Sequence, residues 1–485
     1  MVPLSSSPVQ QVSLAEGQLC RGARADLPTV RHSGLDPAAS DSAVLSPFAR
    51  PPPVPSRAGI HSHAKGRWKG VSQWPIGRVP RLPCNKYFQC TSWVLILRYN
   101  SPVITFTSAS RPREALDPFL SPLPHLGHIR GLDGIRALAF FLVLGGHCGF
   151  RWIPNGLGVT VFFFLSGYLI TTLLRQEWTH TSSLSISHFY IRRAFRILPA
   201  FYVALVLGIM FASTGLTASE VHWNAIGVAL AFLTNYSYLL VGATAPAGLT
   251  VLWSLAVEEH FYFLFPCIYR GLLRGRVRRH RQVIVFGCIC LLTLAWRVTL
   301  MAGFHTDWFR VYSGTDTRLD SILFGSIMAV AVNPVIDNLD RLSRRLCTST
   351  ALMGAVVLIA SIVVRGEMFR QTVRYSIQGL ALFPIFLFVI RYTDSAITRF
   401  LELKFLTHIG ELSYSLYLVH AVMLRAVTVW LRTGLFMTLI LTFTLSYISA
   451  WVMRRYVELP ANKMRNRVVQ QVEQKQFCTT VPQVP

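Results

Sequence analysis

The chain has 485 residues, of which 52% are hydrophobic and only 14% are charged, and its mean hydropathy is +0.43. A soluble protein carries about 25% charged residues, so this composition excludes an ordinary soluble domain. Repeated apolar runs of about 20 residues predict an all-α fold, a polytopic bundle of transmembrane helices.

The net charge of +25 does not predict nucleic-acid binding, because most arginines lie in short clusters between the apolar runs. Such clusters are typical of the cytoplasmic loops of membrane proteins. The nine cysteines are scattered and form no CxxC pair, so we expect no metal site.

Residues 1–120 differ from everything that follows. They are rich in Pro, Ser, Arg and Ala, show no sustained periodicity, and have no charged-then-apolar secretion signal at Met1. This composition predicts a disordered extension or an over-extended reading frame. We expect the membrane domain over 128–465 and a short polar tail over 466–485.

Apolar segments that are candidates for membrane spans fill the membrane domain. They lie at about 132–150, 156–174, 196–213, 224–241, 249–271, 282–301, 318–334, 349–365, 376–392, 411–431 and 434–456.

The arginines between these segments indicate which of them span. The clusters within 175–196 and 270–281 are both expected in the cytoplasm, so an even number of spans must separate them. Three candidates lie between, and the weakest is 224–241, which the polar residues 235–237 interrupt. We predict that 224–241 is re-entrant or interfacial, that about ten helices span a cell membrane, and that both termini are cytoplasmic.

That arrangement has one feature that opposes the charge rule. It places Arg365, Arg370 and Arg374 on the outer side, where arginine is not favoured.

The first span carries an unusual pair of ionisable side chains. Arg136 and His147 are eleven residues apart, which on a helix places them within roughly 20° of one face and about 16 Å apart along the axis. A neutral histidine that faces a cavity is suited to act as a general base, and Asp133 is a polar neighbour on the same helix. The alternative is a histidine that only hydrogen-bonds a neighbouring helix.

A cluster of arginines precedes the third candidate span. Arg192, Arg193 and Arg196 are close enough in sequence to share one helical surface at a membrane edge. Guanidinium groups bind phosphate bidentately, so the cluster suits a nucleotide-type cofactor. The alternative is anchoring to lipid head groups.

Charged residues also occur inside or beside two later spans. Glu258 and Glu259 lie in an apolar run and need buried partners such as Arg or His. A second group consists of Asp316, Arg318 and Asp320. It is expected either to serve the site, by binding the hydroxyls of an acceptor or pairing with Glu259 and Arg136, or to form a local ion-pair network.

The segment 410–420 places further polar residues along one span. Its members are Ser413, Tyr414, Tyr417 and His420, and the histidine is a second candidate for a cavity. The alternative is a polar seam that packs against neighbouring helices.

Taken together, these stretches resemble the membrane acyltransferase family 3, the polysaccharide O-acetyltransferases. The matching stretches are LDGIRALA with His147, FFFLSGYLI (162–170), IRRAFRILPAFY (191–202), LWSLAVEEHFYFLFP (252–266), TDTRLD (315–320), GELSYSLYLVH (410–420) and YVELP (456–460). They occur in the family's order and cover about 130–460.

The resemblance implies about ten transmembrane helices and transfer of an acyl group, usually acetyl from acetyl-CoA, to a hydroxyl of a carbohydrate. The family's arginine-then-histidine motif falls on Arg136 and His147, and its acidic pair falls on residues 258–259. Its second arginine motif falls on Arg193 and Arg196, which would bind the phosphates of an acyl-CoA. The histidine would then act as a general base or as a nucleophile, and Glu258 or Glu259 would orient it or its neighbours.

Two departures from the family pattern stand out. His260 occupies a position where glutamine is commoner. Many relatives also carry a C-terminal extracytoplasmic hydrolase-like domain that this sequence does not show, which leaves open whether a separate extracytoplasmic transferase completes the reaction.

Two other classes of protein fit the same polar helices. A transporter or glycan-export component would use the cavity without chemistry, and a scaffold for envelope assembly would not need His147. The expected partners are the lipid bilayer, an acyl-CoA, and a glycan or another hydroxyl-bearing acceptor whose identity the sequence does not give.

Overall fold

The computed structural model describes residues 128–431 and 433–480, with side chains as far as residue 471. The extension predicted over 1–120 lies outside the described residues. Every regular element within the described ranges is helical, which confirms the all-α prediction.

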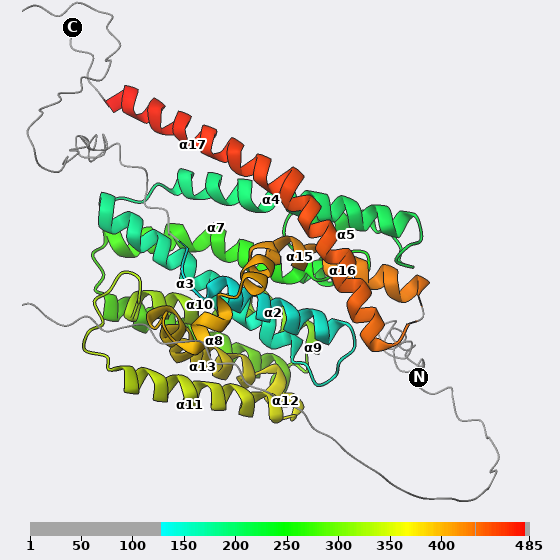
Figure 1. The fold of residues 1–485 in the computed structure, drawn as a ribbon, viewed down its shortest axis with the longest axis horizontal. Helices are drawn as coiled ribbons and strands as arrows, with labels where there is room; N and C mark the ends of the chain where they lie inside the picture. The colour runs from blue at the N-terminus through cyan, green and yellow to red at the C-terminus, as the bar shows by residue number, and fades with distance from the viewer. Residues whose placement is uncertain (1–127, 432, 481–485) are drawn as a thin grey trace, which may run out of the picture. The chain divides into compact units, whose positions relative to one another are not determined.

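Ten helices of the described chain form a bundle in which they run alongside one another (Figure 1). They are α2 (Leu132–His147), α3 (Asn155–Thr181), α4 (Ile186–Ser213), α7 (Leu252–Arg274), α8 (Arg279–Val298), α10 (Thr315–Ala331), α11 (Arg344–Val363), α13 (Val373–Arg391), α15 (Lys404–Trp430) and α16 (Leu435–Met453). In the described chain, 7 helices are long and apolar enough to cross a membrane on their own. The other three, α2, α7 and α10, are shorter or more polar, and they carry much of the predicted site.

The weak candidate span at 224–241 is not a single helix. It is divided into α5 (Trp223–Leu230), the 3-10 turn η2 (Thr234–Tyr236) and α6 (Ser237–Val241). The longest of these has 8 residues, about 12 Å of helix, whereas the hydrocarbon core of a bilayer is about 30 Å thick. This agrees with the prediction that the segment does not span.

Helices α3 and α10 form the centre of the bundle. They approach closely because glycine replaces a side chain on each: a Cβ on Gly167 would overlap the carbonyl of Ile322, and one on Gly325 would overlap the carbonyl of Phe164. Of the most apolar stretch of α3, 78% is buried. Around this pair, α2 packs against α3 and α15, while α8 and α13 pack against α10.

The outer helices expose their apolar side chains. Only 28% of the most apolar stretch of α8 is buried, and only 17% of that of α11. On α11 the exposed side chains include Leu352, Val356 and Ile359. An apolar surface of this extent is stable against lipid and not against water, so the protein is located in a membrane.

The arginine clusters of the loops gather at one end of the bundle, here called the arginine-rich end. Asp337, in the loop after α10, accepts hydrogen bonds from Arg175 at the end of α3 and from Arg279 at the start of α8, at 2.8 and 2.7 Å. At the same end Arg344 pairs with Asp394 at 2.7 Å. The opposite end contains the last turn of α2 and is here called the histidine end.

The chain continues as a helix beyond α16. A five-residue π turn (Arg454–Glu458) leads into α17 (Leu459–Thr480), which packs against α4 (Figure 1). The segment predicted as a polar tail over 466–485 is therefore helical as far as Thr480.

Candidate functional site

The site is built around α2, whose two ends are fixed by glycine. Gly131 precedes the helix with φ +83° and donates its N–H to Glu402 Oε1 at 2.5 Å. The helix ends at His147, because Gly149 reverses the chain with φ +100°. Arg136 and His147 therefore lie on one uninterrupted helix, as the sequence predicts.

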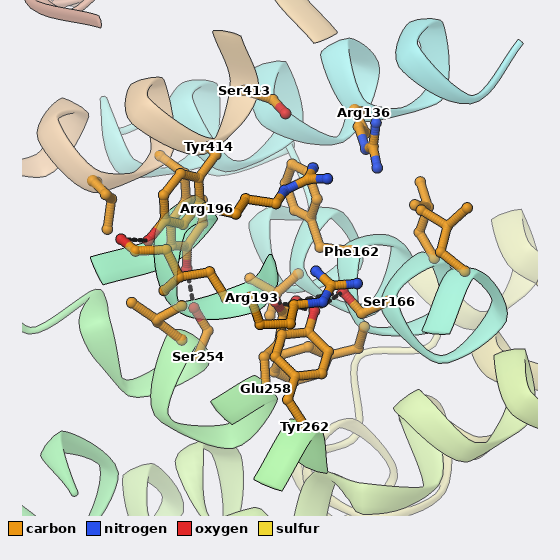
Figure 2. A pocket seen from close by; sticks show the side chains of 18 residues that line it. Arg136, Phe162, Ser166, Arg193, Arg196, Ser254, Glu258, Tyr262, Ser413 and Tyr414 are labelled. Atoms are coloured by element: carbon orange, nitrogen blue, oxygen red, sulfur yellow. Dashed lines mark hydrogen bonds between the residues drawn. The ribbon is translucent and has the colours of Figure 1, made fainter. Parts of the chain in front are cut away.

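A polar cavity of about 120 Å³ opens between α2, α3, α4, α7 and α15, and we call it the arginine cavity. The polar side chains in its wall are Arg136, Ser166, Arg193, Arg196, Ser254, Glu258, Tyr262, Ser413, Tyr414 and Tyr417. Figure 2 shows the guanidinium groups of Arg136, Arg193 and Arg196 around a common space.

Positive charge predominates in the arginine cavity. Arg136 is paired with Asp133 at 2.6 Å. Arg193 lies over the ring of Tyr262, with its guanidinium carbon 4.7 Å from the ring centre, a favourable cation–π contact. Within the described side chains, neither Arg193 nor Arg196 has a carboxylate within ion-pair distance, so both are available to an anionic ligand.

Glu258 is the carboxylate that lines the arginine cavity. It accepts hydrogen bonds from Ser166 at 3.0 Å and from Tyr262 at 2.9 Å. Its neighbour Glu259 is not in the cavity wall, and its Oε1 atom is buried without a hydrogen-bond partner. The predicted acidic pair is therefore divided between two environments.

At the other end of α2, His147 meets His420 of α15. Nδ1 of His147 lies 2.9 Å from Nε2 of His420. The ring planes differ by only 3° and the ring centroids are 5.2 Å apart. The two imidazoles are thus hydrogen-bonded edge to edge in one plane. His420 is completely buried.

The hydrogen bonds of this pair determine where the hydrogens are on two neutral rings. Nδ1 of His420 lies 2.7 Å from the carbonyl oxygen of Tyr417, which can only accept, so this nitrogen carries the hydrogen. Nε2 of His420 is then an acceptor, and Nδ1 of His147 must donate to it. Nε2 of His147 is left with a free lone pair, the form that a general base or nucleophile requires.

His147 faces a second and larger cavity of about 580 Å³ at the histidine end, which we call the vestibule. Val159 and Tyr417 belong to the walls of both cavities, so they separate the arginine cavity from the vestibule. The hydroxyl of Tyr417 is held by Ser254 at 2.6 Å.

Several predicted site residues lie elsewhere. Arg192 does not face the arginine cavity, because it pairs with Glu177 at 3.3 Å. Of the group in α10, Asp320 pairs with Arg297 at 2.6 Å, and both side chains are completely buried. This is the structural ion pair that was one of the two expectations for that residue.

The other two members of the α10 group point in different directions. Asp316 accepts hydrogen bonds from Arg310 and Tyr236, each at 2.7 Å. Arg318 is completely buried over the ring of Tyr375, 3.9 Å from its centre. Neither pairs with Glu259 or Arg136, so that expectation was wrong.

Sequence reasoning missed Ser166, Ser254 and Tyr262. Ser166 was visible as the single polar residue within FFFLSG (162–167). Tyr262 had a weaker signal, its spacing of four residues from Glu258, which places both on one helical face. Nothing in the neighbouring sequence distinguished Ser254 from a serine whose hydroxyl donates a hydrogen bond to a carbonyl of its own helix.

The fold and the two cavities define an integral-membrane helical protein with a basic cavity on one side of a histidine pair and a vestibule on the other. The acyltransferase domain family matches residues 129–455, which is most of the membrane domain. The chain therefore belongs to the membrane acyltransferase family 3, as its motifs indicated.

Named relatives agree with this assignment. The chain is 30% identical over 371 residues to "O-acetyltransferase OatA" of Staphylococcus aureus (strain NCTC 8325 / PS 47), a match that covers 73% of this chain and 61% of the relative. It is 29% identical over 356 residues to "Peptidoglycan O-acetyltransferase OatA" of Listeria monocytogenes, covering 69% of this chain and 56% of the relative. The chain thus spans about three fifths of these relatives. No solved structure matches it significantly.

Proposed function

We propose that this protein transfers an acetyl group from acetyl-CoA to a hydroxyl of a cell-envelope glycan. The observation that carries the proposal is the position of His147. His147, whose Nε2 has a free lone pair, lines the vestibule, while the arginine cavity, with two unpaired guanidinium groups, lies on the other side of Tyr417.

The charges of the loops give the direction of transfer. Arginine is favoured in cytoplasmic loops, so the arginine-rich end faces the cytoplasm. The arginine cavity is nearer to this end, because Arg193 and Arg196 lie in the N-terminal half of α4, which begins at this end directly after α3. A donor made in the cytoplasm would reach it directly, and both ends of the membrane domain would be cytoplasmic.

The arginine cavity suits the phosphates of the donor. Two guanidinium groups without acidic partners attract a polyanion, and bidentate hydrogen bonds to phosphate oxygens are among the strongest polar contacts in proteins. Arg136 is tied to Asp133, so we assign it to orienting the donor rather than to neutralising it. Glu258, fixed by Ser166 and Tyr262, lies in the same wall and would orient the part of the donor that continues from its phosphates toward His147.

The chemical step uses the lone pair of His147. Nε2 removes the proton of the acceptor hydroxyl as its oxygen attacks the thioester carbonyl carbon. The new C–O bond forms, the C–S bond breaks, and the proton passes from the imidazolium to the departing thiolate. His420 holds the imidazole in the required tautomer, as an orienting group does in other histidine-dependent sites.

The test is to incubate the purified chain with acetyl-CoA labelled in the acetyl group and a glycan acceptor. Wild-type protein should consume the label and esterify the glycan, and His147→Ala should lower the rate by about 10²–10⁴-fold, the usual contribution of a general base. His408→Gln is the matched control, because His408 is on α15 but its partner is Tyr447. Full activity of a folded His147→Ala protein would overturn the proposal.

Two further outcomes have a definite meaning. A transporter would bind or move the glycan without consuming labelled acetyl-CoA. If His147 instead attacks the thioester as a nucleophile, rapid quenching would leave label on the histidine before any glycan is added.

A further inference from the structure

The vestibule has a wall that acyl transfer alone does not explain. At about 580 Å³ it is large enough for a sugar ring and its neighbours. It is open at the histidine end, and His147 is part of its wall. Any acceptor that reaches Nε2 of His147 from this end passes through it.

Arginines are concentrated in that wall. Arg151, Arg365, Arg370 and Arg374 line the vestibule, and none of its described lining residues is acidic. Arg370 has only a long contact with Glu367, at 3.4 Å. Arg374 reaches the carbonyl of Val364 at 3.4 Å, and its Nε is buried without a partner.

These arginines are the ones that oppose the charge rule. Arginine is disfavoured at the outer face of a membrane protein, and three of the four lie within 365–374, from just after α11 to the first turn of α13. Topology therefore does not explain them. A binding role does, because an unpaired cation beside a cavity attracts an anion.

Aromatic rings form another part of the wall. Trp253 lies 4.7 Å from Tyr312 between ring centres, and Trp308 and Tyr375 each lie 6.2 Å from the same ring. Trp308 is 54% exposed although it is large and apolar. A continuous aromatic surface with a few polar groups is typical of a site for a flat, partly apolar ligand such as a sugar ring.

A buried charge stands behind this surface. Arg318 is completely buried, with its guanidinium 3.9 Å from the centre of Tyr375, and its Nε and Nη1 atoms have no hydrogen-bond partner. In the described chain no carboxylate lies within ion-pair distance of it. Its charge therefore adds to the positive potential of the vestibule, since a low-dielectric surrounding screens it little.

We propose that the vestibule is the acceptor site and that it selects a sugar bearing a negative charge, a carboxylate or a phosphate. The anion would lie against Arg370 and Arg374, the ring would pack on Trp308 and Tyr312, and a hydroxyl would face His147. The assignment rests on the proposed acyl transfer for the role of the site, but binding can be measured without it.

The experiment compares acceptors that differ only in charge. A neutral chitin oligosaccharide, an oligosaccharide of equal length with a carboxylate on alternate sugars, and a sugar phosphate are each titrated into the full chain in lipid nanodiscs. Binding is followed by tryptophan fluorescence and transfer by labelled acetyl-CoA. The wild type should bind at least one charged acceptor more tightly than the neutral one. Whichever charged acceptor binds more tightly shows whether the preferred anion is a carboxylate or a phosphate.

Substitution then assigns the selectivity to the vestibule. Arg374→Gln should weaken binding of the preferred charged acceptor about tenfold or more, as expected for loss of a hydrogen bond between charged groups. The affinity for the neutral acceptor and the KM for acetyl-CoA should not change. Arg374→Lys retains the charge and should keep most of the selectivity. Arg425→Gln is the matched control. Arg425 is an exposed arginine near the C-terminal end of α15, which lies at the histidine end, and it does not line the vestibule.

The outcomes separate the two proposals. Selective binding without any transfer would overturn the proposed function and leave the vestibule as a site for a charged sugar. Transfer that is equally fast with neutral and charged acceptors would overturn the vestibule proposal alone. So would an effect of Arg374→Gln that appears only in nanodiscs of anionic lipid, since that would assign the arginines to lipid head groups.

Discussion

Replacement of His420 by leucine tests whether the histidine pair is a functional unit. His420 is completely buried and is not itself a lining residue of either cavity. Leucine fills much of the same volume but cannot accept a hydrogen bond, so Nδ1 of His147 loses its partner at 2.9 Å. The free imidazole then no longer prefers the tautomer that leaves Nε2 unprotonated.

The expected fall in rate follows from the hydrogen bond that His147 loses. A hydrogen bond between neutral groups contributes about 1 kcal/mol, and an N–H left buried without a partner costs about 1–3 kcal/mol. His147 itself remains, so the rate should fall by less than on its removal. We expect a loss of about 10- to 100-fold, the range for partners that orient a functional histidine.

The assay is the initial rate of acetyl transfer at saturating donor and acceptor. A positioning role predicts a lower kcat, an unchanged KM for acetyl-CoA, and partial recovery in His420→Gln, whose amide oxygen can accept from His147. A merely structural role predicts less folded protein with normal kcat per folded molecule. Wild-type kcat in folded His420→Leu would refute the assignment of the tautomer.

Three further predictions use other contacts. Arg193→Gln should raise the KM for acetyl-CoA at least tenfold, because a charged hydrogen bond to phosphate contributes about 1.5–3 kcal/mol; donor titrations measure it. Asp320→Asn should destabilise the bundle by about 3–5 kcal/mol, because Arg297 would remain charged and buried without its partner; thermal unfolding in detergent measures it. For Asp337, burial raises the pKa, but the hydrogen bond from Arg175 and the other contacts outweigh it, so the net pKa is lowered. Because this pKa is lowered on folding, the ionised carboxyl stabilises the fold above its unfolded-state pKa, and the stabilisation is lost as pH falls through its folded-state pKa. The Asp337→Asn protein lacks this contribution at every pH, so its free energy of unfolding should fall less than that of the wild type below about pH 4.

Two of these predictions have a control variant on the same surface or of the same chemistry, and the third is compared with the wild type. Arg192→Gln is adjacent to Arg193 but is paired with Glu177, so it should leave donor affinity unchanged. Asp394→Asn breaks an exposed pair and should leave the stability nearly unchanged, because water screens an exposed ion pair. Equal effects of Arg192→Gln and Arg193→Gln, equal destabilisation by Asp320→Asn and Asp394→Asn, or identical acid unfolding of wild type and Asp337→Asn would contradict the corresponding argument.

The sequence alone determined the helical bundle and the family. Apolar runs of spanning length set the long helices, because a backbone in lipid must satisfy its own hydrogen bonds. The arginine clusters on either side and the polar break at 235–237 were together enough to predict that 224–241 does not span. The spacing of Arg136 and His147 placed both on one helix, since helical periodicity is a property of neighbouring residues.

Only the tertiary structure decided which polar side chains meet. His147 and His420 are separated by 273 residues, and no local pattern links them. Arg192 pairs with Glu177 and Asp320 pairs with Arg297, although the sequence had suggested a ligand-binding role for both Arg192 and Asp320. The division into two cavities at Val159 and Tyr417 depends on how α3 and α15 lie against each other, and these residues are far apart in the sequence. Charge and periodicity are local, whereas the partner of a buried polar group is chosen by packing between distant segments.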